Sequence, residues 1–295
     1  MDYVGRIYRP PSEAHSLLIQ VTLGCSHNRC SYCDMYRDKQ FRPKDLEQVE
    51  ADILEAKAHA KRHGPFARKA FLCDGDALIL PTKRLLTILG LIREHLPFIE
   101  RVGVYGDTRS VTRKSVDDLR ALEAAGLGIV YHGMETGDPE VLVAIDKGGT
   151  RDEMIETARR LREADIVHSV MVLLGVGGEK YSEQHAANTA SILTEMDPPY
   201  VGALTTTVVP GTPLAEQQAA GEFRLPSKFR MIEELRTIVA DSEFSNCRFS
   251  SNHASNYLPI RSTLPRDKKA VLEAIDGILA DRDERRLKPE SLRAL

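Results

Sequence analysis

Short apolar runs alternate with amphipathic stretches over the first two thirds of the chain. Runs of strand length cover residues 16–22, 70–73, 101–106, 128–132, 168–174 and 201–209. Between them, apolar residues recur at spacings of three and four, which predicts helices over 45–61, 82–95, 115–124, 152–164 and 183–195. This alternation predicts right-handed βαβ units and therefore a parallel sheet in an α/β fold.

The loop after the first predicted strand favours a barrel over an open sheet. A G-x-G-x-x-G dinucleotide fingerprint is absent there, and cysteines stand in its place. We therefore expect a partial (β/α)6 barrel of TIM-like type, in which functional groups gather on the loops that follow the strands.

Beyond residue 213 the alternation stops. Helices are expected near 227–241 and 267–281, and a polar segment lies between them at 251–257. We divide the chain into a lead-in of residues 1–15, a core barrel of residues 16–213 and a C-terminal extension of residues 214–295 that covers the barrel opening.

Composition and charge narrow the partners that the chain is expected to have. Hydrophobic residues make up 42% of its 295 residues, enough to fill a core. Forty Lys and Arg against 43 Asp and Glu give a net charge of −3, which disfavours a nucleic-acid substrate. The start lacks the pattern of a signal peptide, and no apolar run approaches the ~18 residues of a membrane span. We expect a cytoplasmic protein with no membrane contact.

Three of the five cysteines lie within nine residues, directly after the first predicted strand. Cys25, Cys30 and Cys33 have the spacing C-x4-C-x2-C. In a reducing compartment such a group indicates metal or redox chemistry before disulfides. Three thiolates on one loop can hold a [4Fe–4S] cluster by three irons and leave the fourth iron open. One alternative is that the three cysteines form a zinc site completed by His27. Another is that they are structural thiols that bind no metal.

Residues 16–213 resemble the core of the radical S-adenosylmethionine (radical SAM) superfamily. The resemblance rests on the cysteine loop after strand one, on the aromatic Tyr32 before the last cysteine, and on the barrel size. It is closest to the branch with oxygen-independent coproporphyrinogen oxidases, methylthiotransferases and the Elongator radical subunit. The usual spacing in that superfamily is C-x3-C-x2-C, so this loop has one additional residue.

The resemblance implies cofactors and a reaction. It implies one [4Fe–4S] cluster and SAM, which is reductively split to a 5′-deoxyadenosyl radical that takes a hydrogen atom from a substrate. Because Cys73 and Cys247 are too few for a conventional second cluster, the electron is expected from an external donor such as reduced flavodoxin or ferredoxin.

Site residues follow from the resemblance position by position. Cys25, Cys30 and Cys33 match the cluster ligands, and Tyr32 matches an aromatic position whose backbone lies near the adenine. The family's Gly-Gly-Glu, which holds the methionine amino group, has its counterpart in Asp74-Gly75-Asp76; the alternative for the two carboxylates is a plain Asp-rich turn. The remaining SAM candidates are Glu135 for the ribose or the carboxylate region, and Val172 and Gly175 for the adenine.

Substrate-side residues are suggested only by their positions at predicted strand ends or in the polar segment. Each candidate also has a purely structural reading, such as a buried thiol or a hydrogen-bonded histidine. The candidates are Cys73, Arg109, His132 and His253.

The sequence thus predicts a radical SAM enzyme acting on a small molecule. One alternative is an RNA-modifying enzyme of the same branch, which a basic patch of residues 268, 269, 282, 285 and 286 would support. Another is a zinc-binding or cluster-binding protein without enzymatic activity.

Overall fold

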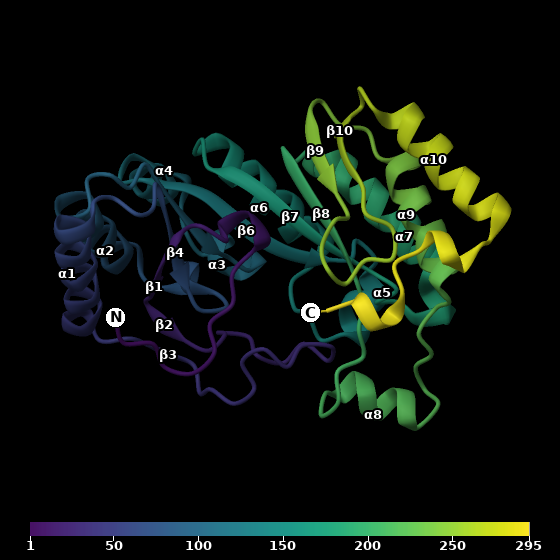
Figure 1. Cartoon of the computed structure of the whole chain (residues 1–295), viewed down its shortest axis with the longest axis horizontal. Helices are drawn as coiled ribbons and strands as arrows, with labels where there is room; N and C mark the ends of the chain where they lie inside the picture. Colours follow the sequence, from purple (N-terminus) through teal and green to yellow (C-terminus); the bar gives the residue numbers. More distant parts are fainter. Residues whose placement is uncertain (295) are drawn as a thin grey trace. The chain divides into compact units, whose positions relative to one another are not determined.

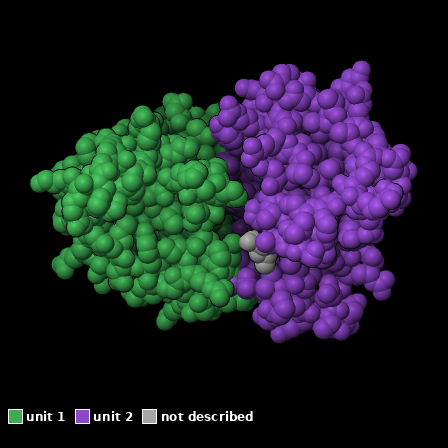
Figure 2. Space-filling model, in the orientation of Figure 1, with its two compact units in different colours: residues 1–28, 35–132, 159–168 green, residues 29–34, 133–158, 169–295 purple. Residues whose placement is uncertain are grey.

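The computed structural model describes residues 1–294 and consists of two compact units (Figure 2). Unit 1 comprises residues 1–28, 35–132 and 159–168, and unit 2 comprises the rest. The main sheet of the described chain has eight strands in the order β1-β4-β5-β6-β7-β8-β9-β10. The expected α/β class is therefore confirmed.

The sheet of unit 1 is parallel and has helices packed on one face. Its strands are β1 (Leu17–Gln20), β4 (Lys69–Cys73), β5 (Arg101–Tyr105) and the start of β6 (Leu127–Glu135). The helices are α1 (Leu46–His63), α2 (Thr82–His95) and α4 (Val116–Ala124). Alternate strand residues such as Leu72 and Val104 are fully buried with Ile53 and Ile88 of the helices, which is the pattern expected of a helix-covered sheet.

Three aromatic rings lie close together among the other residues of these strands. Phe71, Tyr105 and Tyr131 stack edge to face with centroids 5.0 to 6.3 Å apart. The Tyr131 hydroxyl donates to the buried Glu13 carboxylate, which also pairs with Arg101. Glu13 ends a short 3-10 helix, η1 (Pro11–Glu13), so this polar contact ties the lead-in to the sheet.

Unit 2 contains four strands and three long helices. β7 (Val167–Leu174), β8 (Tyr200–Thr205) and β9 (Cys247–Ser250) are parallel, and β10 (Arg261–Leu264) is antiparallel to β9. α9 (Lys228–Asp241) packs against both α7 (Gly178–Met196) and α10 (Lys268–Asp281), as Figure 1 shows.

The sequence did not predict β9 and β10, although it placed helices α9 and α10 correctly to within one residue at either end. Both strands have four residues, and polar side chains occupy several of their positions. The extension after residue 213 therefore contributes strands to the sheet.

Several shorter elements complete the described chain. They are β2 (Thr22–Leu23), β3 (Arg42–Pro43), α3 (Thr108–Thr112), α5 (Pro139–Ala144), α6 (Arg151–Glu163), α8 (Pro213–Ala219), η2 (Ala77–Ile79), η3 (Glu284–Arg286) and η4 (Glu290–Leu292). Three expected boundaries were wrong by three or more residues: β6 continues to Glu135, α7 begins at Gly178, and β8 ends at Thr205. Among residues 1–294, no helix has the length and apolarity needed to cross a membrane.

Candidate cofactor-binding site

The cysteine loop is anchored through its backbone, and its thiols stay partly exposed. Cys25, Cys30 and Cys33 form no disulfide, and each is partly exposed. The Ser31 N–H donates to the Ile145 carbonyl at 2.8 Å, and the Ser31 carbonyl accepts from the Leu214 N–H at 2.9 Å. These two contacts fix the loop through backbone atoms.

The additional residue between the first two cysteines is accommodated by a left-handed turn. Asn28 has φ of +47°, a conformation that asparagine adopts more readily than most residues. Its side-chain amide donates to the Tyr36 carbonyl at 2.9 Å. The C-x4-C spacing therefore has a local structural explanation in this chain.

The donor set suits an iron–sulfur cluster better than a preformed zinc site. Three thiols without a disulfide are the ligands that a cluster prefers. His27, the candidate fourth zinc ligand, is buried, and its Nδ1 lies 3.0 Å from Nη2 of Arg109. Within residues 1–294, no group of three or more His, Cys, Asp and Glu side chains is arranged as a ready metal site. The assignment thus depends on the ligand chemistry and the spacing.

Gly75 lies against the cysteine loop and leaves no room for a side chain. A Cβ at this position would lie 2.6 Å from the Tyr36 ring and 3.0 Å from Cβ of Cys25. Such a distance is far below van der Waals contact. Glycine is therefore required between the two aspartates by packing alone.

The Asp74 carboxylate is an interior hydrogen-bonding centre. It accepts from the Gly24 N–H at 2.9 Å, from Nε2 of Gln20 and from Nζ of Lys39 at 2.9 Å. Burial raises the pKa of Asp74, and these donors oppose that rise. The contacts give Asp74 a structural task that the sequence did not reveal.

The Asp76 carboxylate ties together three segments of unit 1. It accepts from the Asp107 N–H at 3.1 Å, from Ser110 Oγ at 2.6 Å and from the Ser26 hydroxyl. Burial, and then the neighbouring Asp107 carboxylate, raise the pKa of Asp76 to about 6. A carboxylate has about four acceptor positions, so three protein donors leave one for a ligand.

Two SAM candidates of unit 2 lie together. The Tyr32 hydroxyl donates a hydrogen bond to the Glu135 carboxylate. Burial, and then the charge of this carboxylate, raise the pKa of Tyr32 well above its usual value. Glu135 has φ of +66° and pairs with Nζ of Lys147 at 3.8 Å. It is the last residue of β6, and its positive φ is a backbone conformation that glutamate rarely adopts.

The other two SAM candidates differ in their surroundings. Val172 is fully buried in the apolar core of unit 2, which also contains Ile232 of α9. Gly175 follows β7 with φ of +79°, and its N–H donates to the Glu234 carboxylate at 2.6 Å. Only Gly175 thus presents backbone at the end of the strand.

Three of the substrate candidates have structural partners. Cys73 is fully buried, its Sγ donates to the Phe71 carbonyl at 3.8 Å, and burial raises its thiol pKa. His132 is fully buried between Thr108 and His168, with contacts of 2.9 and 3.2 Å. His253 Nδ1 bonds Ser255 Oγ at 2.9 Å. Arg109, the fourth candidate, has a buried guanidinium nitrogen, Nε, without a hydrogen-bond partner, as Arg84 and Arg101 also have.

A buried polar cluster in unit 2 went unnoticed in the sequence. Glu234 of α9 lies 3.9 Å from Nε2 of His185 in α7, and both side chains are at most 2% exposed. Burial raises the pKa of Glu234 to about 7 and lowers that of His185 to about 4. Both residues sit in amphipathic helices among other polar residues, so no sequence signal separates them from surface positions.

These opposite shifts predict a pH effect on stability. Between about pH 4.5 and 7, Glu234 keeps its proton in the native state and loses it in the unfolded state. Its contribution therefore lowers the free energy of unfolding of the protein as pH rises through that window. His185 stays neutral in the native state and becomes protonated in the unfolded state as pH falls from 6.5 to 4. Its contribution therefore lowers the free energy of unfolding as pH falls through that range. Between pH 4.5 and 6.5 the two groups change the free energy of unfolding in opposite directions, so their contributions nearly cancel.

Glu234→Gln removes the contribution of Glu234, so the pH dependence of the unfolding free energy that comes from His185 should become measurable. Between pH 6.5 and 5 the variant should lose about 1–2 kcal/mol more unfolding free energy than the wild type, measured by urea unfolding. Glu233→Gln, at the neighbouring surface position, should follow the wild-type curve. Parallel curves for Glu234→Gln and the wild type would contradict the assignment.

Parallel strands, partly exposed cysteines after the first of them and polar groups at later strand ends define an iron–sulfur enzyme of the barrel class. Residues 19–190 match the model of the radical SAM superfamily. The chain belongs to this superfamily, whose members are enzymes that use a [4Fe–4S] cluster and SAM, and which generally need a reductant such as flavodoxin or ferredoxin.

Two curated relatives illustrate the breadth of the similarity. A heme chaperone, HemW, of Mycobacterium tuberculosis is 24% identical over 238 residues, which cover 78% of this chain and 59% of the relative. A biotin synthase of Caulobacter vibrioides is 28% identical over 180 residues, which cover 60% of this chain and 50% of the relative. The chain thus spans about half to three fifths of the length of these proteins.

Solved structures show the same fold. The radical SAM coproporphyrinogen III oxidase HemN of Escherichia coli has a TM-score of 0.57 and 17% identity, covering 76% of this chain and 51% of its own. The radical SAM methyltransferase TsrM of Kitasatospora setae, solved with cobalamin and a [4Fe–4S] cluster, has a TM-score of 0.56 and 22% identity, covering 76% and 45%. These likenesses confirm the partial barrel that the sequence predicts.

Proposed function

We propose that this chain is a radical SAM enzyme that takes a hydrogen atom from a small-molecule substrate. The observation that carries the proposal is the C-x4-C-x2-C loop after β1, within a chain of this superfamily. When bound and reduced, the cluster supplies the electron that splits SAM and yields the 5′-deoxyadenosyl radical. We propose a reduced flavodoxin or ferredoxin as the electron donor.

The chain's own residues have separate tasks in this proposal. Cys25, Cys30 and Cys33 ligate three irons, and Gly75 keeps the Asp74–Asp76 turn close to Cys25. One free acceptor position on Asp76 is available for the ammonium group of the cofactor. The Glu135 carboxylate accepts from ribose hydroxyls, which are donors, and Tyr32 packs nearby.

Arg109 is our candidate for contact with the substrate. Its buried Nε lacks a partner in the described structure, while Nη2 is held by His27 of the cysteine loop. A guanidinium with a free donor suits a carboxylate or phosphate group. Its contact with His27 supports a place near the cluster.

Deuterium transfer separates the small-molecule proposal from the RNA alternative. The reduced enzyme is incubated with SAM and either the low-molecular-weight fraction or the RNA fraction of cells grown on deuterated medium. Deuterium in 5′-deoxyadenosine is expected only with the low-molecular-weight fraction. Deuterium from the RNA fraction alone would establish the alternative and overturn the substrate class that we propose.

A further inference from the structure

Helix α9 carries a buried carboxylate that holds the backbone at the end of β7. Glu234 Oε2 accepts the N–H of Gly175 at 2.6 Å, and Oε1 accepts the hydroxyl of Ser182 at 2.6 Å. Glu234 is 2% exposed, so these bonds are not exchanged for water. A bond from a backbone N–H to a carboxylate is among the stronger hydrogen bonds in proteins.

The same helix fixes Gly175 by packing. A Cβ on Gly175 would lie 2.8 Å from Sδ of Met231, which is three residues before Glu234 on α9. The positive φ of Gly175 also disfavours any larger residue. One helix therefore determines both the conformation and the position of this glycine.

His185 extends the network to the end of β6. Its Nδ1 lies 2.7 Å from Oγ1 of Thr136, and that oxygen accepts the N–H of Asp138 at 3.0 Å. Thr136 directly follows Glu135. Nε2 of His185 lies 3.9 Å from Oε2 of Glu234, so the two side chains are in contact without a hydrogen bond between them.

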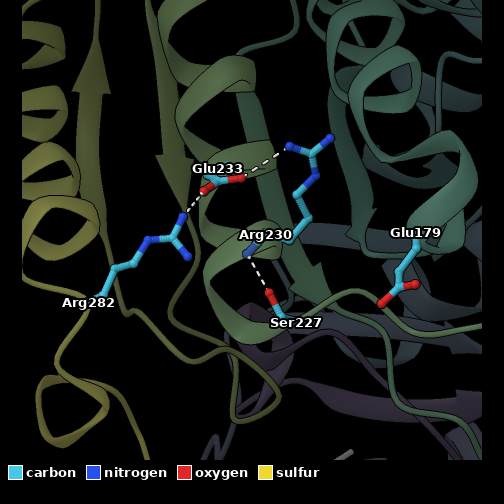
Figure 3. A pocket seen from close by; sticks show the side chains of 5 residues that line it. All are labelled: Glu179, Ser227, Arg230, Glu233 and Arg282. Atoms are coloured by element: carbon cyan, nitrogen blue, oxygen red, sulfur yellow. Dashed lines mark hydrogen bonds and ion pairs between the residues drawn. The ribbon is translucent and has the colours of Figure 1, made fainter.

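The outer end of the network reaches a surface cavity of about 370 Å³. Figure 3 shows Arg230 beside this cavity, paired with Glu233, which also pairs with Arg282. Nε of Arg230 donates to the Ser182 hydroxyl at 3.1 Å. Because Arg230 and Arg282 both have carboxylate partners, the cavity offers no free charge to a ligand, and we assign it no binding role.

We propose that Glu234 and His185 are positioning residues for the nucleoside part of SAM. They hold Gly175 after β7 and the segment around Glu135 after β6, and they do not touch the cofactor themselves. The proposal rests on the proposed function, since it takes these two segments as the ones that contact SAM. It adds that α9, in the extension after residue 213, sets the affinity of the site.

Glu234→Ala and Glu234→Gln test the proposal as a matched pair. The alanine variant is expected to raise the dissociation constant for SAM about tenfold, measured by calorimetry on the cluster-loaded enzyme. It should also speed amide hydrogen exchange in peptides containing Gly175. Glutamine keeps an oxygen for the Gly175 N–H and an amide for Ser182, so it should restore both values to within about threefold.

Asp241→Ala is the control, because Asp241 is an exposed carboxylate in the last turn of the same helix and, in the described structure, makes no hydrogen bond to the groups around Glu234. Its dissociation constant should stay within twofold of the wild type. An unchanged dissociation constant and unchanged exchange in Glu234→Ala with full iron content would overturn the proposal. Absence of SAM binding by the wild type would instead overturn the proposed function.

Thr136→Val tests the same network from its other end and covers the case in which Glu234→Ala does not fold. The change removes the hydroxyl that bonds His185 and nearly preserves volume. We expect a three- to tenfold weaker affinity for SAM, with unchanged cluster absorption. Wild-type affinity in this variant would contradict a positioning role for His185.

Discussion

Cys30→Ala is expected to abolish cluster binding and SAM cleavage. Removing one of three ligands leaves only two thiolates on the loop, which do not hold a [4Fe–4S] cluster. We expect cleavage to fall by more than about 100-fold, beyond the 10- to 100-fold that loss of an outer partner of a metal site costs. The measurements are iron content, visible absorption and 5′-deoxyadenosine formed after dithionite reduction.

Cys247→Ala is the matched control. Cys247 is fully buried in β9, within the apolar core of unit 2. Burial raises its thiol pKa to about 12, so it is not a thiolate at neutral pH. This variant should keep its iron and its cleavage rate. Full iron content in Cys30→Ala would remove Cys30 from the ligand set.

Asp74→Ala is expected to destabilise the protein by about 3–5 kcal/mol. The ion pair of Asp74 with Lys39 is almost completely buried, and removal of one partner leaves the other charge unpaired. The Gly24 N–H, directly before Cys25, loses its acceptor as well. The free energy of unfolding from denaturant titration measures the effect.

The double variant Asp74→Ala/Lys39→Met should recover part of this loss, because it removes both charges. The exposed pair of Asp117 with Arg120 provides the comparison, and Asp117→Ala should leave stability nearly unchanged. A free energy of unfolding for Asp74→Ala within 1 kcal/mol of the wild type would show that the pair does not stabilise the fold. A selective loss of SAM binding in that case would favour the ammonium role.

The cysteine loop could be predicted because its chemistry is local. Cys25, Cys30 and Cys33 lie within nine residues, so their spacing alone restricts the ligands that they can share. The central strands were also predictable, since runs such as residues 168–174 are mostly apolar and the alternate residues His168, Val170 and Val172 are buried. Strand β9 was not predicted, because its four residues are too few for their alternation of apolar and polar side chains to stand out in the sequence.

The residues that hold the candidate site in place were not predictable, because they contact residues far away in the sequence. Lys39 lies 35 residues before Asp74, and Glu234 lies 59 residues after Gly175. A carboxylate in an amphipathic helix is usually solvated, so its burial becomes visible only in the structure. Glu135 shows a smaller error: the sequence predicts a strand that ends at residue 132, and in the structure β6 continues to Glu135.

The most direct test of the central claim is cleavage of SAM by the wild-type protein. The protein is reconstituted anaerobically with iron and sulfide, reduced with dithionite and incubated with SAM. We predict about four irons per chain, and methionine and 5′-deoxyadenosine in equal amounts. A protein that holds four irons and forms no 5′-deoxyadenosine would contradict the account.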